Sequence, residues 1–353
     1  MKALKTALKV LLILVLAVII AAVCLIGWLS IAEYKPDAVE ERDISGAPEN
    51  QPLHAGRELS VLSWNIGYGG LGAGSDFFMD GGENVKSADR ATVEAYLSGI
   101  GAAIDSAGAE LVLLQEVDVN SSRTYGIDEA ALLQRGGGVH ALNYSCPFVP
   151  FPLPPIGRVN SGVFITTEYS MDSAERIALP CPFSWPVSTA NLKRCLLVTY
   201  LPIEGSDKQL VLVNLHLEAY DDGEGKLAQT RQLNEFIQAE YEKGNYVIAG
   251  GDFNQIFPGS LEVYPNTHPE LWEPGVLTED MLPEGFSYAY DLSVPSCRLL
   301  NQPYNPADGE NTQHYVIDGF ILSPNVRLES AETLDLGFAN SDHNPVLIRV
   351  VLD

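Results

Sequence analysis

Short apolar runs recur along this chain from residue 59 to its end, and they constrain its fold more than any other feature. Each run is rich in Val, Leu and Ile and is bounded by turn-forming residues, which is typical of strands buried on at least one face. Helical patterns are rarer. Many strands with few helices predict two packed sheets with helices on the outside. The predicted strands are 59–66, 111–117, 162–167, 195–201, 210–217, 246–253, 315–322 and 345–352.

Two amphipathic helices are predicted, at residues 87–108 and 226–245. Ser87 is a candidate N-cap for the first helix and Gly108 a candidate stop, while Gly244 would end the second. Their apolar residues recur at helical spacing and would pack on the sheets. These residues are Val93, Leu97, Ile100 and Ile104 in the first helix, and Leu233, Phe236, Ile237 and Tyr241 in the second.

The N-terminus is apolar for long enough to cross a bilayer. Lys2, Lys5 and Lys9 precede residues 10–29, which carry no charge and would span ~30 Å as a helix. Because the basic flank favours the cytoplasm, the rest of the chain is expected outside the cell membrane. Signal peptides usually have apolar regions of ~7–15 residues, which is shorter than this one, so we favour a retained single-pass anchor. A cleaved signal peptide, releasing a secreted protein, is the alternative.

Three parts follow along the chain: an anchor or signal segment at 1–32, an acidic tether at 33–57 and a folded domain at 58–353. The segment 33–57 is interpreted as a tether because it is polar, acidic and interrupted by Pro. Outside the cytoplasm, one or two disulfides could form among the later cysteines. The sequence contains no C-x-x-C spacing, so a zinc site built from thiolates is not expected. These cysteines are Cys146, Cys181, Cys195 and Cys297.

The chain is strongly acidic, with a formal net charge of −25 at pH 7. Affinity for DNA comes mainly from Lys and Arg side chains that neutralise phosphates, so tight non-specific DNA binding is not expected. A hydrolase that meets a phosphate through a metal ion is not excluded by this charge.

Polar residues with metal- or phosphate-binding chemistry stand at the ends of most predicted strands. Singly, such residues are common turn formers and caps. Together they predict a functional site that holds a cation, because burying several carboxylates near one another is costly unless a cation neutralises them. They are Asn65, Gln115, Glu116, His216, Asp252, Asn254, Asp318, Ser341, Asp342 and His343.

The motifs LSWN, LLQEV, LVNLHL, GGDFN, IDGFIL and SDHNPV resemble those of the endonuclease/exonuclease/phosphatase superfamily, which has a deoxyribonuclease-like fold. They occur in the family's order and cover residues 58–353. The resemblance implies a four-layered α/β sandwich, with two central, mostly antiparallel sheets flanked by helices. It also implies hydrolysis of phosphoester bonds with a divalent cation, Mg²⁺ or alternatively Mn²⁺.

The resemblance also implies roles for individual residues. Glu116 would be a metal ligand, with Asn65 beside it and Asp342 completing the metal side. Asp252 would activate the attacking water, and Asn254 would donate its amide to a phosphate oxygen. We expect residues 252 and 254 to share one face of an extended segment.

Two histidines would contact the phosphate. His343 would face the scissile phosphate with its ring held by Asp318, which would raise its pKa. His216 would be a second phosphate donor. Asn160 is a further candidate for substrate binding, and Arg123 could equally bind phosphate or lie solvated in a loop.

The substrate stays open among nucleic acids, phospholipids and small phosphodiesters. A membrane anchor would place the site near lipid headgroups, so a sphingomyelinase-like lipid phosphodiesterase is one alternative. A non-catalytic, surface-anchored binding module on the same fold is another. The apolar N-terminus predicts the membrane as a partner, and no protein partner is predicted.

Overall fold

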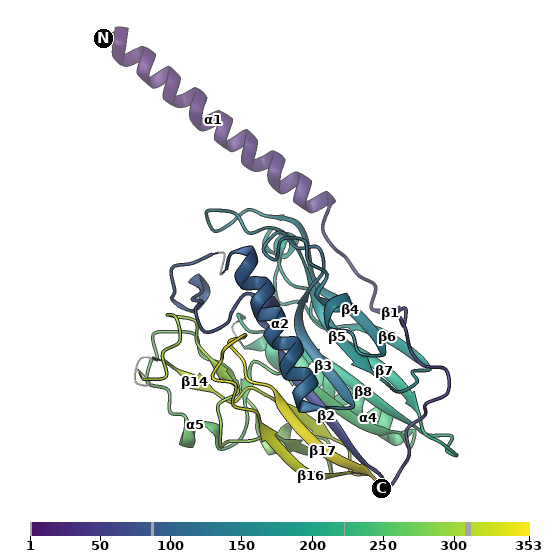
Figure 1. The fold of residues 1–353 in the computed structure, drawn as a ribbon. Coiled ribbons are helices and arrows are strands. Elements are labelled where there is room, and N and C mark those ends of the chain that lie inside the picture. Colours follow the sequence, from purple (N-terminus) through teal and green to yellow (C-terminus); the bar gives the residue numbers. More distant parts are fainter. Residues whose placement is uncertain (1, 86–87, 222, 308–311) are drawn as a thin grey trace.

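A computed structural model describes residues 2–85, 88–221, 223–307 and 312–353. Its first sheet has six strands in the order β16-β17-β2-β3-β5-β4 (Figure 1). The strands β2 and β3 run parallel, whereas the other neighbours are antiparallel. The bounds are β2 (Glu58–Asn65), β3 (Leu111–Asp118), β4 (Gly137–Val149), β5 (Gly157–Thr167), β16 (Val326–Thr333) and β17 (Val346–Leu352).

The second sheet has seven strands in the order β1-β6-β7-β8-β9-β15-β12. The strands β8 and β9 run parallel, whereas the other neighbours in the described part of this sheet are antiparallel. The bounds are β1 (Val39–Glu41), β6 (Ser173–Ala178), β7 (Cys195–Pro202), β8 (Gln209–His216), β9 (Tyr246–Asp252), β12 (Ser287–Ala289) and β15 (Asp318–Leu322).

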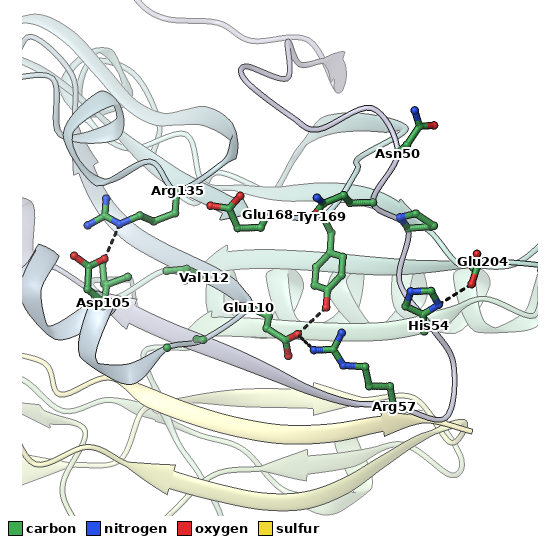
Figure 2. Close-up of a pocket in the computed structure, with 15 residues that line it drawn as sticks. Asn50, His54, Arg57, Asp105, Glu110, Val112, Arg135, Glu168, Tyr169 and Glu204 are labelled. Carbon is green, nitrogen blue, oxygen red and sulfur yellow. Dashed lines mark hydrogen bonds and ion pairs between the residues drawn. The ribbon is translucent and has the colours of Figure 1, made fainter.

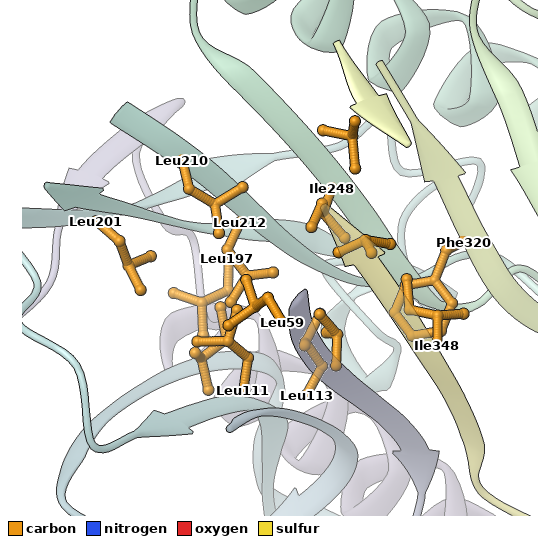
Figure 3. Close-up of a cluster of buried hydrophobic side chains, with 14 of the residues drawn as sticks. Leu59, Leu111, Leu113, Leu197, Leu201, Leu210, Leu212, Ile248, Phe320 and Ile348 are labelled. Carbon is orange, nitrogen blue, oxygen red and sulfur yellow. The ribbon is translucent and has the colours of Figure 1, made fainter. Parts of the chain in front are cut away.

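The two sheets pack face to face, and a long helix covers the outer face of each. Strand alternation explains the layers: in β2, Leu59 and Val61 enter the core between the sheets, whereas Leu62 and Trp64 pack under α2 (Arg90–Ala107). Figure 3 shows the core between the sheets. Helix α4 (Glu224–Glu242) packs on the seven-stranded sheet. The predicted four-layered sandwich is therefore confirmed.

The helix boundaries follow local chemistry. The Asp89 side chain caps α2 by accepting a hydrogen bond from the Thr92 amide at 2.8 Å, while the predicted cap Ser87 lies outside the described residues. Gly108, with φ +61°, ends α2 in the left-handed region, which glycine tolerates. Gly244, with φ +88°, follows α4 as predicted.

The segment 33–57 is packed on the domain, which corrects its interpretation as a free tether. Its strand β1 pairs with β6 at the edge of the seven-stranded sheet. Further along, Ser45 bridges to Gly138 and the buried Leu53 bridges to Ile203. This pairing depends on distant partners, which composition alone does not reveal.

The remaining elements are short, and several lie in the region 255–314, which lacks long periodic patterns. All five cysteines lie within the described residues, and the structure has each of them as a free thiol. The short elements are α3 (Glu129–Leu133), α5 (Ser260–Val263), β10 (Gln255–Ile256), β11 (Gly275–Val276), β13 (Cys297–Arg298), β14 (His314–Tyr315), and the 3-10 helices η1 (Gly67–Gly69), η2 (Phe78–Asp80), η3 (Val187–Ala190) and η4 (Glu279–Met281).

The N-terminal helix α1 (Lys2–Ile31) projects away from the sandwich (Figure 1). It is long and apolar enough to cross a membrane. A signal sequence has the same properties. The last turns of α1 touch the domain, where Leu25 and Leu29 pack on Cys146, Val149 and Val159.

Candidate functional site

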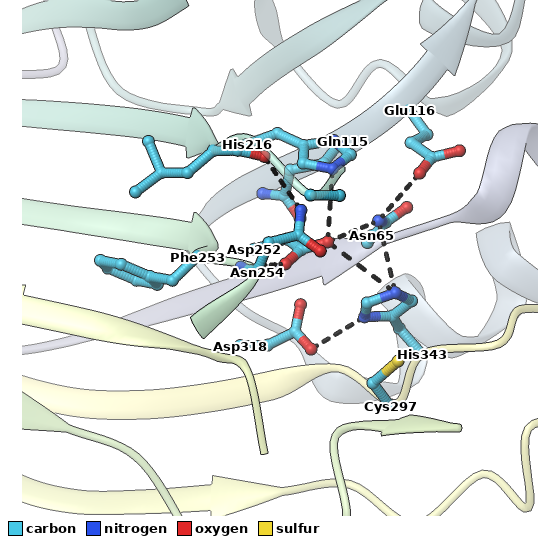
Figure 4. Close-up of polar contacts among 12 residues, drawn as sticks. Asn65, Gln115, Glu116, His216, Asp252, Phe253, Asn254, Cys297, Asp318 and His343 are labelled. Carbon is cyan, nitrogen blue, oxygen red and sulfur yellow. Dashed lines mark hydrogen bonds and ion pairs between the residues drawn. The ribbon is translucent and has the colours of Figure 1, made fainter. Parts of the chain in front are cut away.

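The polar ends of strands from both sheets meet at one end of the sandwich (Figure 4). Parallel pairing brings the carboxyl ends of neighbouring strands to the same edge, so Asn65 at the end of β2 lies opposite Gln115 of β3. In the other sheet, His216 at the end of β8 lies opposite Asp252 at the end of β9. Antiparallel pairing then places Asp318, the first residue of β15, opposite Asp252.

Asp252 is the centre of this site. Its Oδ2 accepts a hydrogen bond from Asn65 Nδ2 at 3.0 Å. The same oxygen lies 3.4 Å from His216 Nε2 and 3.8 Å from His343 Nε2. One carboxylate oxygen thus faces an amide and two imidazoles, all of them buried. The arrangement surrounds a candidate base with polar groups that can hydrogen-bond to it or to a substrate beside it.

The ring of His343 is fixed from its far side by Asp318. Their closest atoms, His343 Nδ1 and Asp318 Oδ2, are 2.8 Å apart. Asp318 is in turn held by Ser296, whose hydroxyl donates to the same carboxylate oxygen at 2.7 Å. Trp64 Nε1 donates to the carbonyl of His343 at 2.8 Å. With Nδ1 bound to Asp318, the other ring nitrogen of His343 points toward Asp252 (Figure 4).

Asp342 approaches from the loop before β17. Ser341 ties this loop to the sheet because its hydroxyl donates to the Asn65 carbonyl at 2.7 Å. The amide of Arg298 donates to the Asp342 carbonyl at 3.0 Å. These contacts bring the SDHNP segment next to the end of β2.

A bulge in β3 directs Glu116 into the site. Gln115 pairs with Val163 of β5 and Val117 with Gly162, which leaves Glu116 as the extra residue. Its φ of +57° lies in the left-handed region, which costs energy for a residue with a side chain and is common at functional sites. Glu116 Oε1 accepts a hydrogen bond from Asn65 Nδ2 at 3.2 Å.

Asn254 differs in detail from the sequence expectation. The chain is not extended there: β9 ends at Asp252, and Asn254 has φ +50°. Its backbone amide donates to Asp252 Oδ1 at 2.8 Å, and its side-chain Nδ2 donates to the Leu217 carbonyl at 2.9 Å. The expected alternation between residues 252 and 254 is therefore wrong, although Asn254 does adjoin the site. Phe253, between them, packs in the core under α4.

Burial shifts the acid–base properties of the site. Burial and the adjacent Asp318 carboxylate raise the pKa of Asp252 to about 7. Burial also raises the pKa of Asp342 to about 7, and Glu116 adds to the rise. Burial works against protonation of His343, yet Asp318 raises its pKa well above the usual range. Burial lowers the pKa of His216 well below the ordinary histidine value.

The carboxylates offer places for a cation. One oxygen or nitrogen from each of Asp252, Asp318 and His343 lies within 4.8 Å of the others. In that group, however, Asp318 and His343 already bind each other. Glu116 and Asp342 form a second acidic pair, close enough for Glu116 to raise the pKa of Asp342. Carboxylate oxygens are the ligands that a hard divalent cation prefers, so these residue types fit such an ion.

Two further candidates lie near this end of the sheets but hold other partners. Arg123 donates to both oxygens of Asp118, at 2.8 and 2.9 Å, and its guanidinium lies 3.5 Å from the centre of the Tyr68 ring. Asn160 Oδ1 accepts a hydrogen bond from Ser145 at 2.9 Å. The contacts do not bring either one to Asp252, and their roles in substrate binding stay predictions.

Asp80, in the Gly-rich loop at 67–86, was not predicted. It accepts hydrogen bonds from the Leu300 amide at 3.1 Å and the Tyr220 hydroxyl at 3.4 Å. Burial raises its pKa to about 6, and the charge of His343 acts on it. Arg298 fixes the loop by donating to the Gly72 carbonyl at 3.0 Å. The only sequence signal was an aspartate in a loop too long to be a simple connection.

A hollow at the opposite end of the sheets is distinct from this site (Figure 2). It has a volume of about 680 Å³ and lies near the starts of β2 and β3. Its charged groups pair with one another: Arg57 with Glu110 at 2.8 Å, and Arg135 with Asp105 at 2.7 Å. The clustered catalytic-type residues therefore lie elsewhere.

Comparison with known proteins identifies the family of this chain. The model of the Endonuclease/Exonuclease/phosphatase family matches residues 62–343. No individual curated sequence is similar enough to count as a relative. Among solved structures, an endonuclease/exonuclease/phosphatase from Beutenbergia cavernae is similar at 16% identity and a TM-score of 0.55, over 84% of this chain and 72% of that one.

Two more solved structures share the fold. A protein of the same description from Bacteroides vulgatus has 15% identity and a TM-score of 0.55, covering 84% of this chain and 100% of that one. The human Nocturnin catalytic domain, with a bound sulfate anion, has 19% identity and a TM-score of 0.51, covering 88% of this chain and 98% of that one. The family consists of phosphoesterases that generally use a divalent metal. With its four layers, its strand-end residues and a family match over most of its length, this chain belongs to the Endonuclease/Exonuclease/phosphatase family.

Proposed function

We propose that the protein hydrolyses phosphoester bonds with a divalent cation, Mg²⁺ or alternatively Mn²⁺. The observation that carries this proposal is the convergence of Asn65, His216 and His343 on one oxygen of Asp252. A purely structural aspartate would need no such set of polar neighbours. The raised pKa of Asp252, about 7, suits a group that accepts a proton near neutral pH.

Glu116 and Asp342 would hold the cation, with Asn65 beside them. When bound, the ion would neutralise phosphate charge and stabilise the leaving oxygen. Asn65 would fix the geometry between the two halves of the site, because its one amide nitrogen donates to both Glu116 and Asp252. Asp252 would orient a water molecule and accept its proton for in-line attack on phosphorus.

The two histidines would take different protonation states. His343 has a raised pKa, so it would be cationic and stabilise charge that develops on the phosphate oxygens. Asp318 would keep its ring oriented and charged. His216 has a lowered pKa and would donate a hydrogen bond as a neutral imidazole. Asn254 would position Asp252 through its backbone amide and contribute its amide to phosphate binding.

We infer that the reaction takes place outside the cell membrane, with α1 as a single-pass anchor and the N-terminus in the cytoplasm. The uncharged helix behind a basic N-terminus supports this topology. The substrate is a phosphoester of a nucleic acid, a phospholipid or a small molecule. A lipid-headgroup substrate is the alternative that an anchored site favours most.

The test is hydrolysis by the full chain in detergent micelles, with plasmid DNA, sphingomyelin, inositol phosphates and a chromogenic phosphodiester as substrates. Each is assayed with Mg²⁺, with Mn²⁺ and with EDTA. We expect metal-dependent turnover of at least one substrate. Asp252→Asn and His343→Ala should each reduce it by about 10²–10⁴-fold, the range of an acid–base group.

Matched controls are available on the surface. The Asp207 side chain is 87% exposed and the His54 side chain 50% exposed, so Asp207→Asn and His54→Ala should keep full activity. Turnover that survives both Asp252→Asn and His343→Ala would refute the assigned roles. No turnover of any substrate with either metal would instead favour the non-catalytic binding module.

A further inference from the structure

Two loops expose large apolar side chains around the end of α1. The first connects β4 to β5 and carries Phe151, which is 71% exposed, and Leu153, which is 79% exposed. The second connects β6 to β7 and carries Trp185 and Val187, exposed by 64% and 57%. Large apolar side chains gathered at this exposure mark an interaction surface. We call these four residues the apolar rim.

Both loops lack charge in a chain that is otherwise strongly acidic. No Asp, Glu, Lys, Arg or His occurs between His140 and Arg158, or between Arg176 and Lys193. Both are rich in Pro, which has no backbone N–H group and holds the chain in a fixed conformation. Segments with few charges and few unpaired amide donors lose little on leaving water for a bilayer interface.

The loops extend from the same end of the sandwich as the catalytic site. Ser161 of β5 pairs with Asp118, just beyond Glu116, so the chain that precedes β5 continues outward on that side. Likewise Leu196 of β7 pairs with Leu215, next to His216, so the loop before β7 lies at the same end. The strand registers thus place the apolar rim and the site on one side of the domain.

The end of α1 is attached to these loops. Leu29 packs on Cys146 and Val149, which precede the first loop. Trp185 Nε1 donates to the Ser30 hydroxyl at 2.9 Å, and the Lys193 ammonium pairs with Glu33 at 3.0 Å. In Figure 1 the last turn of α1 meets the domain at these teal loops. A bilayer spanned by residues 10–29 would therefore end at the level of the apolar rim.

We propose that the apolar rim inserts into the outer surface of the phospholipid bilayer and holds the catalytic end of the domain against the lipid headgroups. The occupant is a lipid surface because the rim continues the apolar surface of α1. Contact through apolar side chains, without a basic cluster, also suits a chain of net charge −25, since it does not depend on anionic lipids. Tryptophan at the headgroup level is typical of membrane interfaces.

This inference rests on the anchor proposed above, but it does not require hydrolysis. The test reconstitutes the full chain in phosphatidylcholine vesicles whose acyl chains are brominated and quench tryptophan fluorescence. Trp28→Phe removes the tryptophan within α1. The other two are shielded from lipid, since Trp64 is buried and Trp272 is partly buried with its ring nitrogen bonded to the Ala219 carbonyl. In this background the remaining quenching should come from Trp185.

We expect the quenching to be lost in Trp28→Phe/Trp185→Phe. It should also be reduced in Trp28→Phe with Phe151→Ser and Leu153→Ser, which keeps Trp185 but removes half of the rim. Leu227→Ser in the same background is the matched control, because Leu227 is 49% exposed on α4 and should leave the quenching unchanged. Raising the salt concentration should have no effect.

Quenching that is the same with and without Trp185 would overturn the proposal, as would extraction of the full chain from the vesicles by alkaline carbonate. Asp252→Asn separates this inference from the proposed function. Quenching should persist in this variant although its hydrolysis is reduced. Quenching in an unsubstituted chain that hydrolyses none of the substrates would support the rim and count only against the proposed enzyme.

Discussion

At the scale of single residues, the site is organised by pairs in which one side chain fixes another. Asp318 fixes His343, and Asn65 joins Glu116 to Asp252. Low-dielectric surroundings strengthen such contacts and make an unpaired partner costly. A substitution in one member should therefore alter the behaviour of its partner, and not only the rate.

Asp318→Asn tests the first pair through the pH dependence of the reaction. Asp318 raises the pKa of His343 against the effect of burial, so without this carboxylate the pKa should fall. His343 would then lose its proton at lower pH, and the alkaline limb of the kcat/KM profile should move to lower pH. The loss of activity, about 10²–10⁴-fold, should be larger at pH 8 than at pH 6. An alkaline limb that keeps its position would contradict a charged His343, and Asp207→Asn serves as the control.

At the scale of elements, the ends of the strands depend on close backbone approach and on a polar link between the sheets. Gly251, just before Asp252, has φ +153°, and a Cβ atom there would lie 1.9 Å from the Leu215 carbonyl oxygen. Beneath the site, Gln115 Nε2 donates to Asn214 Oδ1 at 2.8 Å, which joins β3 to β8 across the core. Both features lie at the level where β8 and β9 present His216 and Asp252.

Gly251→Ala should destabilise the protein by more than ~3 kcal/mol, because backbone strain and a clash with a fixed carbonyl add together. Chemical denaturation of the two proteins measures this difference. Gly205→Ala is the control: Gly205 also has positive φ, +72°, but nothing lies within 4 Å of the added Cβ, so it should cost only ~1–2 kcal/mol. Equal costs for both would show that close approach at Gly251 is unimportant.

Asn214→Ala should also be destabilising, by ~2–4 kcal/mol. The Asn214 side-chain amide donates to the carbonyls of Leu114 and Phe164, both at 2.9 Å. Its removal takes this donor from two buried carbonyls and takes from Gln115 the shortest of its side-chain hydrogen bonds. Thermal unfolding measures the change. Asn325→Ala, whose amide bonds to the Asn245 carbonyl at the edge of the fold, should cost less, and the reverse order would contradict the role of the link.

At the scale of the whole molecule, several carboxyl groups of this acidic chain are buried at the end of the domain that carries the candidate site. Burial raises the pKa of Asp252 and Asp342 to about 7 and that of Asp80 to about 6. A carboxyl group whose pKa is raised by folding stabilises the folded state fully below its unfolded pKa of about 4. That stabilisation is lost as pH rises through the folded value. The metal-free protein should therefore weaken between about pH 4 and pH 7.

The measurement is the thermal midpoint Tm in EDTA across this pH range. We expect a fall of at least ~2–4 °C, the shift that ~1 kcal/mol causes in a large domain. A divalent ion binds the deprotonated site, so Mg²⁺ should raise Tm more at pH 8 than at pH 5. Asp342→Asn should flatten the dependence. A Tm that rises steadily from pH 4 to pH 7 in EDTA would contradict buried, proton-binding carboxylates.

The sequence predicted the layers and most of the site because both depend on local patterns. The apolar runs identify the strands in the centre of each sheet, and polar residues at their ends identify the site. Other features depend on contacts between distant segments. The bulge that turns Glu116 requires β5 as a partner, and β1 forms only against β6. Asp80 is buried because Leu300 binds it and Arg298 holds its loop, and both partners are distant in the sequence.

The central claim is that Glu116 and Asp342 hold one divalent ion beside Asp252. A crystal structure of the full chain grown with Mn²⁺ and phosphate tests it most directly, because Mn²⁺ is located by anomalous scattering. The account predicts one peak within ~2.0–2.4 Å of a Glu116 carboxylate oxygen, with the phosphate between the ion and His343. A Mn²⁺ peak bound by Asp252, Asp318 and His343, with none at Glu116, would contradict it.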